Sequence, residues 1–106
     1  MISFDEFKKI ELKVAEVKSV ADHPNADKLV VLNIDVGGTE KQIVAGIKGH
    51  YESDALIGKK IVVVTNLEPA TLRGVESQGM LLAAVEGDRV VLLTPDQDVS
   101  AGAGVQ

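Results

Sequence analysis

Short apolar runs separated by turn-forming residues constrain what this chain can fold into more than any other feature of its sequence. The first run begins at Ile10 and alternates apolar with polar residues. The later runs are residues 29–36, 42–45, 61–65, 80–85 and 90–93. Gly37-Gly38 and Gly87-Asp88 have the composition of tight hairpin turns. Such runs are typical of β-strands, and none approaches the ~20 apolar residues that cross a bilayer. The sequence predicts an all-β fold and no membrane partner.

The first residues carry the signals of a short helix. Ser3 can cap its N-terminus, and Glu6 stands where a capping box requires an acidic residue. Ile2 and Phe7 have the spacing of a hydrophobic staple. We expect this helix to end near Lys9.

Three further segments have local signals of their own. The first strand changes phase after Val14, which predicts a β-bulge near residues 15–16. Residues 52–56 could hold one helical turn, with Ser53 as its cap and Gly58 as its stop. The glycine- and alanine-rich tail, residues 100–106, is expected to be loose.

The order of these elements indicates a fold class. Five strands, with a short helical piece between the third and fourth, follow the order of an OB-fold. We therefore expect a five-stranded OB-fold barrel with a short N-terminal helix and an extra C-terminal strand. Residues 1–106 fit a single domain of ordinary size. Another small β-barrel or a β-sandwich is the alternative.

Composition limits the partners of such a domain. The net charge is −5, which counts against a generic nucleic-acid binder but allows a local basic patch. There are three aromatic residues and no cysteine. An RNA partner would therefore be recognised through shape and backbone contacts more than by base stacking, and disulfides and thiolate metal sites are excluded. Acidic residues stand near the N-terminus where a signal peptide is basic, so we expect a cytoplasmic protein.

The connection 66–79 is the strongest candidate for a functional surface. Loops of this length are uncommon in compact domains and are usually functional or disordered. It joins the fourth and fifth strands, and OB-folds use this loop and the one after the first strand, here 21–27, to bind oligonucleotides. We expect the apolar residues Leu67, Leu72 and Val75 to anchor it. The outward-facing set would be Asn66, Arg73, Ser77 and Gln78. The alternative for Arg73 is a surface ion pair with Glu76.

The run from Asn66 to Met80, NLEPATLRGVESQGM, resembles the signature of the tRNA-binding domain of methionyl-tRNA synthetases. That domain is similar to free-standing tRNA-binding proteins and to endothelial-monocyte-activating polypeptide II. Other stretches agree in the same order: FDEF before ELKV, HPNADKL at 23–29 and VAGI at 44–47. The resemblance covers essentially the whole chain.

This resemblance implies a non-catalytic domain without a cofactor, which recognises tRNA by shape at the outer corner of its L. It also implies a homodimer formed by the C-terminal half and the N-terminal helix, and a place within or beside an aminoacyl-tRNA synthetase. The residues expected to contact RNA are Lys28, Lys48, Asn66, Arg73, Ser77, Gln78 and Met80, with Lys13 as a further candidate. The family commonly has basic residues where this chain has Glu68 and Thr71. We therefore expect weak, salt-dependent binding.

The same fold also suits functions other than tRNA binding. A protein-interaction or CsaA-type chaperone module on the same fold is one alternative, and a structural dimerisation domain is another. His23 and His50 lack the spacing of metal ligands, so no metal site is expected. Ser77 lacks the Gly-x-Ser-x-Gly elbow of a nucleophilic serine, so no catalytic residue is expected.

Overall fold

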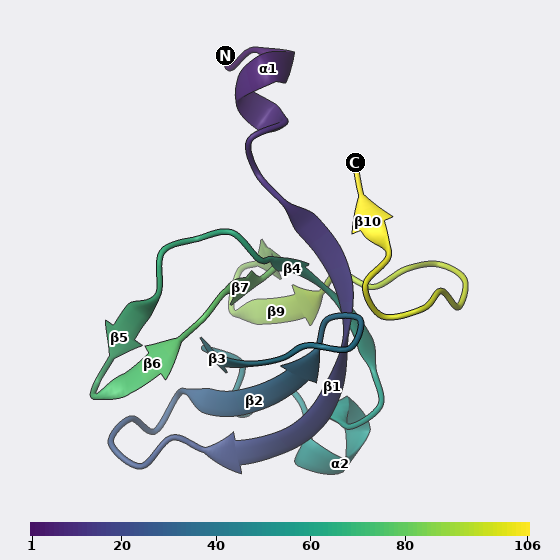
Figure 1. Ribbon diagram of the computed structural model, residues 1–106. Helices are drawn as coiled ribbons and strands as arrows, with labels where there is room; N and C mark the ends of the chain where they lie inside the picture. Colours follow the sequence, from purple (N-terminus) through teal and green to yellow (C-terminus); the bar gives the residue numbers. More distant parts are fainter.

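Strand β1 (Leu12–Asp22) is the centre of the sheet in the computed structural model, which describes all 106 residues (Figure 1). It pairs antiparallel with β2 (Val30–Asp35), β4 (Lys60–Val64) and β10 (Gly104–Val105). With β3 (Glu40–Ala45) and β7 (Met80–Leu81) outside these, the order is β3-β2-β1-β4-β7. The other elements are α1 (Phe4–Phe7), α2 (Ser53–Leu56), β5 (Ala70–Leu72), β6 (Val75–Ser77), β8 (Ala83–Glu86) and β9 (Arg89–Leu92).

The sheet curls until its two outer strands, β3 and β7, contact each other, so that it forms a nearly closed barrel. The largest fully buried side chains line the inside of this barrel, among them Leu32, Ile34, Ile43 and Ile61. Helix α2 follows β3 and adds its buried Leu56 to the same core. The prediction of an all-β OB-fold barrel is confirmed, including the helical piece between the third and fourth strands.

The irregularity in β1 lies later than predicted. Its register against β2 shifts between Val17 and Ser19, whereas its pairing with β4 continues without a shift over residues 12–16. Val14 is buried outside the main core cluster, where its N–H donates to the carbonyl oxygen of Ala103 at 2.8 Å. The phase change at Val14 therefore reflects burial on two faces of the strand.

Two other local predictions need correction. The predicted strand 80–85 is divided, because β7 pairs with β4 whereas β8 pairs with β9. The hairpin turn between β8 and β9 lies at Gly87-Asp88, as predicted. The N-cap of α2 is Glu52, without a side-chain capping bond, so Ser53 is the first helical residue and not the cap.

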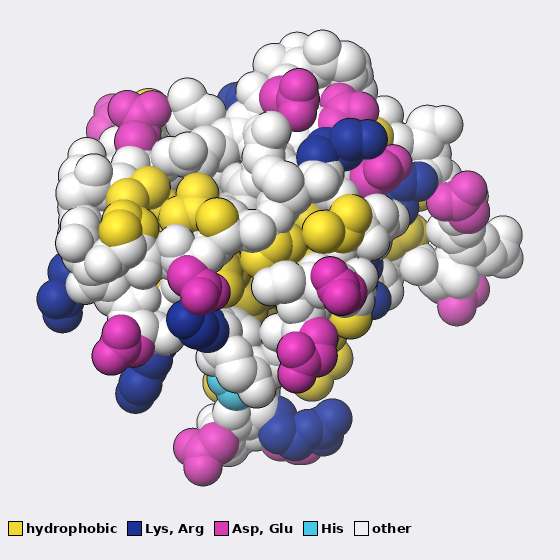
Figure 2. Space-filling model, turned by 90° about the horizontal axis from the view of Figure 1, so that it is seen from below, with side chains coloured by type: hydrophobic (Ala, Val, Ile, Leu, Met, Phe, Trp, Pro, Cys, Tyr) yellow, Lys and Arg dark blue, Asp and Glu magenta, His cyan; other side chains and the backbone are white.

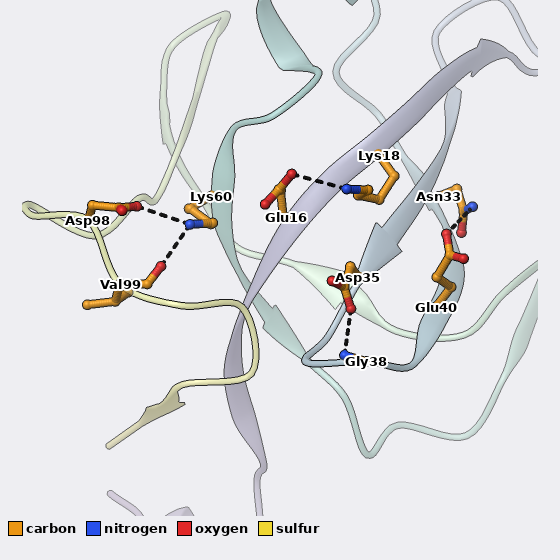
Figure 3. Close-up of polar contacts among 9 residues, drawn as sticks. All are labelled: Glu16, Lys18, Asn33, Asp35, Gly38, Glu40, Lys60, Asp98 and Val99. Atoms are coloured by element: carbon orange, nitrogen blue, oxygen red, sulfur yellow. Dashed lines mark hydrogen bonds and ion pairs between the residues drawn. The ribbon is translucent and has the colours of Figure 1, made fainter.

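The C-terminal segment, residues 94–106, is bound to the barrel, so the prediction of a loose tail is wrong. Its strand β10 pairs with the start of β1. The Lys60 ammonium lies 3.0 Å from Asp98 Oδ1 and donates to the carbonyl oxygen of Val99 at 2.8 Å (Figure 3). These contacts join residues far apart in the sequence, which composition does not reveal.

The β2–β3 hairpin also supports this segment. Gly37 and Gly38 form its turn with φ of 82° and 98°, and Asp35 Oδ1 accepts the Gly38 N–H at 2.8 Å (Figure 3). A Cβ added to Gly37 would lie 2.9 Å from the Cα of Gly102. Only glycine therefore allows the turn and the C-terminal segment to approach this closely.

Helix α1 projects from the barrel, near the C-terminus (Figure 1). The predicted capping box is present: the Glu6 N–H donates to Ser3 Oγ, and the Ser3 N–H donates to the Glu6 carboxylate. The helix has no buried residue, and Phe4 is 72% exposed. Neither helix has the length and apolar character needed to cross a membrane.

Candidate nucleic-acid interface

The connection 66–79 is a β-hairpin and not an irregular loop. β5 and β6 pair antiparallel, and Leu72 stands opposite Val75, which leaves Arg73-Gly74 as a two-residue turn. Both turn residues have positive φ, 52° and 89°, as type I′ hairpin turns require. Asn-Gly is the usual pair at such turns, and Arg73 is the one non-glycine residue of the chain with positive φ. The backbone is therefore strained at a residue whose side chain is exposed.

The apolar residues do not anchor this hairpin as predicted. Leu67 is 46% exposed and Leu72 is 39% exposed, whereas Val75 is half-buried. The hairpin is held instead by hydrogen bonds to its main chain.

Two of these bonds come from the turn between β1 and β2, which lies beside the hairpin (Figure 1). His23 Nε2 lies 2.8 Å from the carbonyl oxygen of Leu72. Asn25 Nδ2 donates to the carbonyl oxygen of Arg73 at 3.1 Å. The two loops that OB-folds use for oligonucleotides thus form one continuous surface, which we call the two-loop face: residues 23–29 and 70–76.

Two predicted cationic residues, Lys28 and Arg73, meet on this face. Both line a pocket of about 440 Å³ that also includes Asn25 and Leu29. Arg73 takes part in none of the ion pairs of the structure, so the predicted alternative, a pair with Glu76, is not formed. Its five guanidinium N–H groups can therefore bind a ligand.

The other predicted cations are partly neutralised. Lys48 lies 3.2 Å from Asp22 Oδ2, and Lys13 lies 4.0 Å from Glu11 Oε1. Both pairs are solvent-exposed, so each contributes little stability and could exchange for a phosphate. Met80 is 49% exposed at the start of β7, where it pairs with Val64.

Ser77 and Gln78 close the barrel, so the prediction that they face outward is wrong. Ser77 is only 5% exposed, and its Oγ accepts the N–H of Val44 at 3.0 Å. The N–H of Gln78 donates to the carbonyl oxygen of Gln42 at 2.8 Å, and its Oε1 accepts the Gln42 N–H at 2.9 Å. The Gln42 side chain donates to the carbonyl oxygen of Glu76 at 2.8 Å. These bonds join β3 to the chain after β5 at the one place where the barrel lacks a regular ladder; we call them the barrel seam.

Asn66 fixes the segment between α1 and β1. Its Oδ1 accepts the N–H of Glu11 at 2.8 Å, and its Nδ2 donates to the carbonyl oxygen of Lys9 at 2.7 Å. Although Asn66 is exposed, both ends of its amide are therefore engaged within the chain. The amide thus orients the segment that leads from the N-terminal helix, and an RNA contact of Asn66 stays a prediction.

The surroundings of these cations are not strongly basic. Acidic and basic side chains are interspersed on the face shown in Figure 2. Glu68 and Thr71, where the resemblance implies basic residues, are both exposed. The two-loop face itself has two cations, Lys28 and Arg73, and two acidic residues, Asp27 and Glu76, so it attracts a polyanion only weakly.

The geometry also bears on the alternatives of metal binding and nucleophilic catalysis. Both ring nitrogens of His23 are engaged, since Nδ1 accepts the N–H of Asn25 at 2.9 Å while Nε2 faces Leu72. No group of three or more histidine and acidic side chains gathers as a metal site would require. The Ser77 hydroxyl donates to the carbonyl oxygen of Gly79 at 2.9 Å, within the barrel seam.

Sequence reasoning missed three residues that shape this face: His23, Asn25 and Gln42. In the sequence, His23 and Asn25 belong to a turn segment that resembles the family, and no local pattern indicates that they contact the hairpin. Their hydrogen-bond partners lie 48 or 49 positions away along the chain.

Comparisons with known proteins agree with this geometry. Residues 12–104 match the family described as "Putative tRNA binding domain". The methionine–tRNA ligase of Thermococcus kodakarensis is 52% identical over 105 residues, which are 99% of this chain and 14% of the ligase. This chain thus spans about one-seventh of that relative's length.

Solved structures give the same result. The MetRS-related protein of Pyrococcus horikoshii is 39% identical with a TM-score of 0.92, covering 100% of this chain and 98% of that one. The CsaA chaperone protein of Picrophilus torridus is 36% identical with a TM-score of 0.93, and the match covers 100% of both chains. Family, sequence and structure agree over nearly every residue, and the chain therefore belongs to the tRNA-binding domain family.

Proposed function

We propose that this domain binds tRNA without catalysing a reaction, and that the two-loop face is where it does so. The observation that carries the proposal is Arg73. Its backbone adopts a conformation that suits asparagine or glycine, yet the residue is an arginine without an ion-pair partner, in the same pocket as Lys28. Strain at an exposed turn is retained where the side chain has a use, and a planar guanidinium suits phosphate oxygens.

The contacts of this face suit recognition of shape. None of the three aromatic residues belongs to either loop, and the Tyr51 hydroxyl accepts the N–H of Leu92 inside the domain. Stacking on unpaired bases therefore contributes little here. Helical RNA instead presents phosphates and 2′-hydroxyls across a wide, shallow groove. Lys28, Lys48 and Arg73 would contact phosphates, and Met80 would pack beside them. Ser77 and Gln78 hold the hairpin against β3, and Asn66 orients the segment before β1.

The test is titration of tRNA with this domain at several salt concentrations, read by fluorescence anisotropy. We expect weak binding whose affinity falls steeply with salt, since each phosphate contact releases counterions. Arg73→Ala should weaken binding and lower the salt slope by about one. Arg89→Ala is the matched control: it removes the chain's other arginine, which is paired with Glu86 on the β8–β9 hairpin. Absence of a complex at low salt, or equal losses in both variants, would refute the proposal.

We also propose that the domain is a homodimer. The side chains of Phe4, Phe7 and Ile10 line an apolar groove of about 650 Å³ with Leu12 and Val105. A helix of four residues is not stable alone, and α1 has no buried residue. A second copy seated on this groove would cover both the helix and the groove in a symmetric contact. Light scattering should give the mass of two chains at micromolar concentration, and Phe4→Ser should shift it to one. A monomer mass for the wild-type chain would refute this.

The relatives suggest where such a domain acts. We propose that it is a part or a partner of a methionine–tRNA ligase in the cytoplasm, where it would raise the effective concentration of tRNA near the catalytic domain. Adding the domain to a ligase that lacks one should then lower the KM for tRNA and leave the KM for methionine unchanged.

A polypeptide-binding role, as the CsaA likeness suggests, is the second candidate. The observation that favours it is the exposure of three apolar side chains, Leu67, Leu72 and Met80, within one segment of an acidic domain. Suppression of the aggregation of an unfolded protein would support it, provided that Leu72→Ser abolishes the effect and Arg73→Ala does not.

A further inference from the structure

The imidazole of His23 connects the β1–β2 turn to the main chain of the β5–β6 hairpin through a part-buried hydrogen bond. His23 is 6% exposed, in a turn whose neighbours Asp22 and Pro24 are exposed. The N–H of Asn25 can only donate, so Nδ1 must carry a lone pair. The carbonyl oxygen of Leu72 can only accept, so Nε2 must carry the proton. The two bonds together fix the neutral Nε2–H tautomer.

A second bond acts beside the first. Asn25 Nδ2 donates to the carbonyl oxygen of Arg73, the residue after Leu72. We call the bonds His23–Leu72 and Asn25–Arg73 the loop clasp. It holds two successive carbonyl groups at the tip of the hairpin, the second of which belongs to Arg73, the residue with φ of 52°.

The loop clasp holds only one strand of the hairpin, β5. β6 is joined to β3 by the barrel seam through Glu76 and Ser77. β5 is exposed along its whole length, and its end is bonded to the β1–β2 turn by the loop clasp. Without the clasp, β5 and the Arg73 turn would be free to move away from Lys28, and ordering them again on binding would cost affinity.

We propose that His23 is a positioning residue for tRNA binding: its Nε2–H bond to Leu72 couples the two loops, so that Lys28 and Arg73 face the RNA as one fixed pair of cations. This inference rests on the proposed function of the two-loop face. His23 itself touches no RNA; it acts through the backbone of Leu72 and Arg73.

Two substitutions separate the cross-loop bond from the bond within the turn. His23→Asn keeps an acceptor where Nδ1 lies, but its side chain is too short to reach Leu72. His23→Gln places an amide N–H donor where Nε2 lies, but loses the acceptor for Asn25. If His23 acts across the loops, the asparagine variant should bind tRNA about five-fold more weakly, the effect of one lost hydrogen bond, whereas the glutamine variant stays within about two-fold of wild type.

The experiment combines anisotropy titrations of the full chain at low salt with NMR of the same samples. Amide hydrogen exchange of residues 70–77 should speed up in His23→Asn and not in His23→Gln. Binding weaker in His23→Gln than in His23→Asn, or losses without faster exchange in the hairpin, would overturn the proposal. If the wild-type chain binds no tRNA, the proposed function fails. The rates of amide hydrogen exchange of residues 70–77 in the two variants then decide whether the loop clasp exists. Imidazole nitrogen spectra of the wild type need no variant, and an Nδ1–H tautomer there would overturn the proposal.

Discussion

Replacing Arg73 by asparagine should make the domain more stable and a poorer RNA binder. Arg73 has φ of 52°, in the left-handed region, and forms the first position of a two-residue turn whose second position is Gly74. A residue with a Cβ destabilises the folded state by about 1–2 kcal/mol when its backbone is in this region. Asparagine recovers part of that free energy through local hydrogen bonds. The Arg73 side chain is exposed and forms no ion pair, so its removal sacrifices few stabilising contacts.

The expected gain is about 0.5–1 kcal/mol in the free energy of unfolding, or about 2–6 °C in Tm for a domain of this size. Glycine would relieve the same strain but would also make the unfolded chain more flexible, so Arg73→Gly should gain less than Arg73→Asn. Urea titration and thermal denaturation followed by circular dichroism measure the gain. The affinity for tRNA should fall about five- to ten-fold in both variants, as expected for the loss of one charge-assisted contact.

Arg89→Asn is the control for net charge, because Arg89 lies in β9 beyond its own hairpin turn. Arg89→Asn relieves no backbone strain, so it should not raise the free energy of unfolding. It should change the affinity for tRNA by no more than about two-fold. A less stable Arg73→Asn variant would show that the arginine side chain stabilises the hairpin. A more stable variant with unchanged tRNA affinity would show that the strain has no connection with RNA.

Three other changes test the remaining parts of the domain. Ser77→Ala leaves the N–H of Val44 without its partner in a buried seam and should cost about 1–3 kcal/mol in urea unfolding; an unchanged midpoint would contradict the barrel seam. Gly37→Ala should destabilise the domain more than Gly38→Ala and speed amide exchange in the C-terminal segment, because both positions have positive φ but only Gly37 lies against that segment; equal losses would argue against the contact. Glu68→Lys restores a cation at an exposed position, and should tighten tRNA binding and steepen its salt dependence by about one phosphate contact; no change at low salt would place residue 68 outside the contact.

Features whose causes lie close together in the sequence were predictable. The capping box of Ser3 and Glu6 involves residues three positions apart, and Gly37-Gly38 forms its turn because glycine alone adopts positive φ without loss. The strand order followed from apolar runs whose period of two reflects burial on one face. In each case the stabilising interaction is encoded within a few residues.

Features that depend on distant contacts were not predictable from local patterns. The segment after residue 94 has a loop-like composition, yet it is ordered by Lys60 and by the start of β1. Leu72 looked like an anchor because it is apolar, but the loop clasp holds its carbonyl oxygen and leaves its side chain exposed. Polarity in the sequence gives a residue's capacity for hydrogen bonds, whereas its partner depends on the fold.

The run from Asn66 to Met80 combines two requirements of different physical origin. Ser77 and Gln78 must be polar because the barrel leaves main-chain groups at its seam that require partners. No main-chain group of the barrel requires an arginine at position 73, and we expect its turn to be more stable with asparagine. The barrel seam can therefore be complete in a chain whose exposed positions, such as residue 68, have no positive charge. The motif then predicts the shape of the two-loop face, and we expect the strength of RNA binding to depend on how many cations on that face are free of acidic partners.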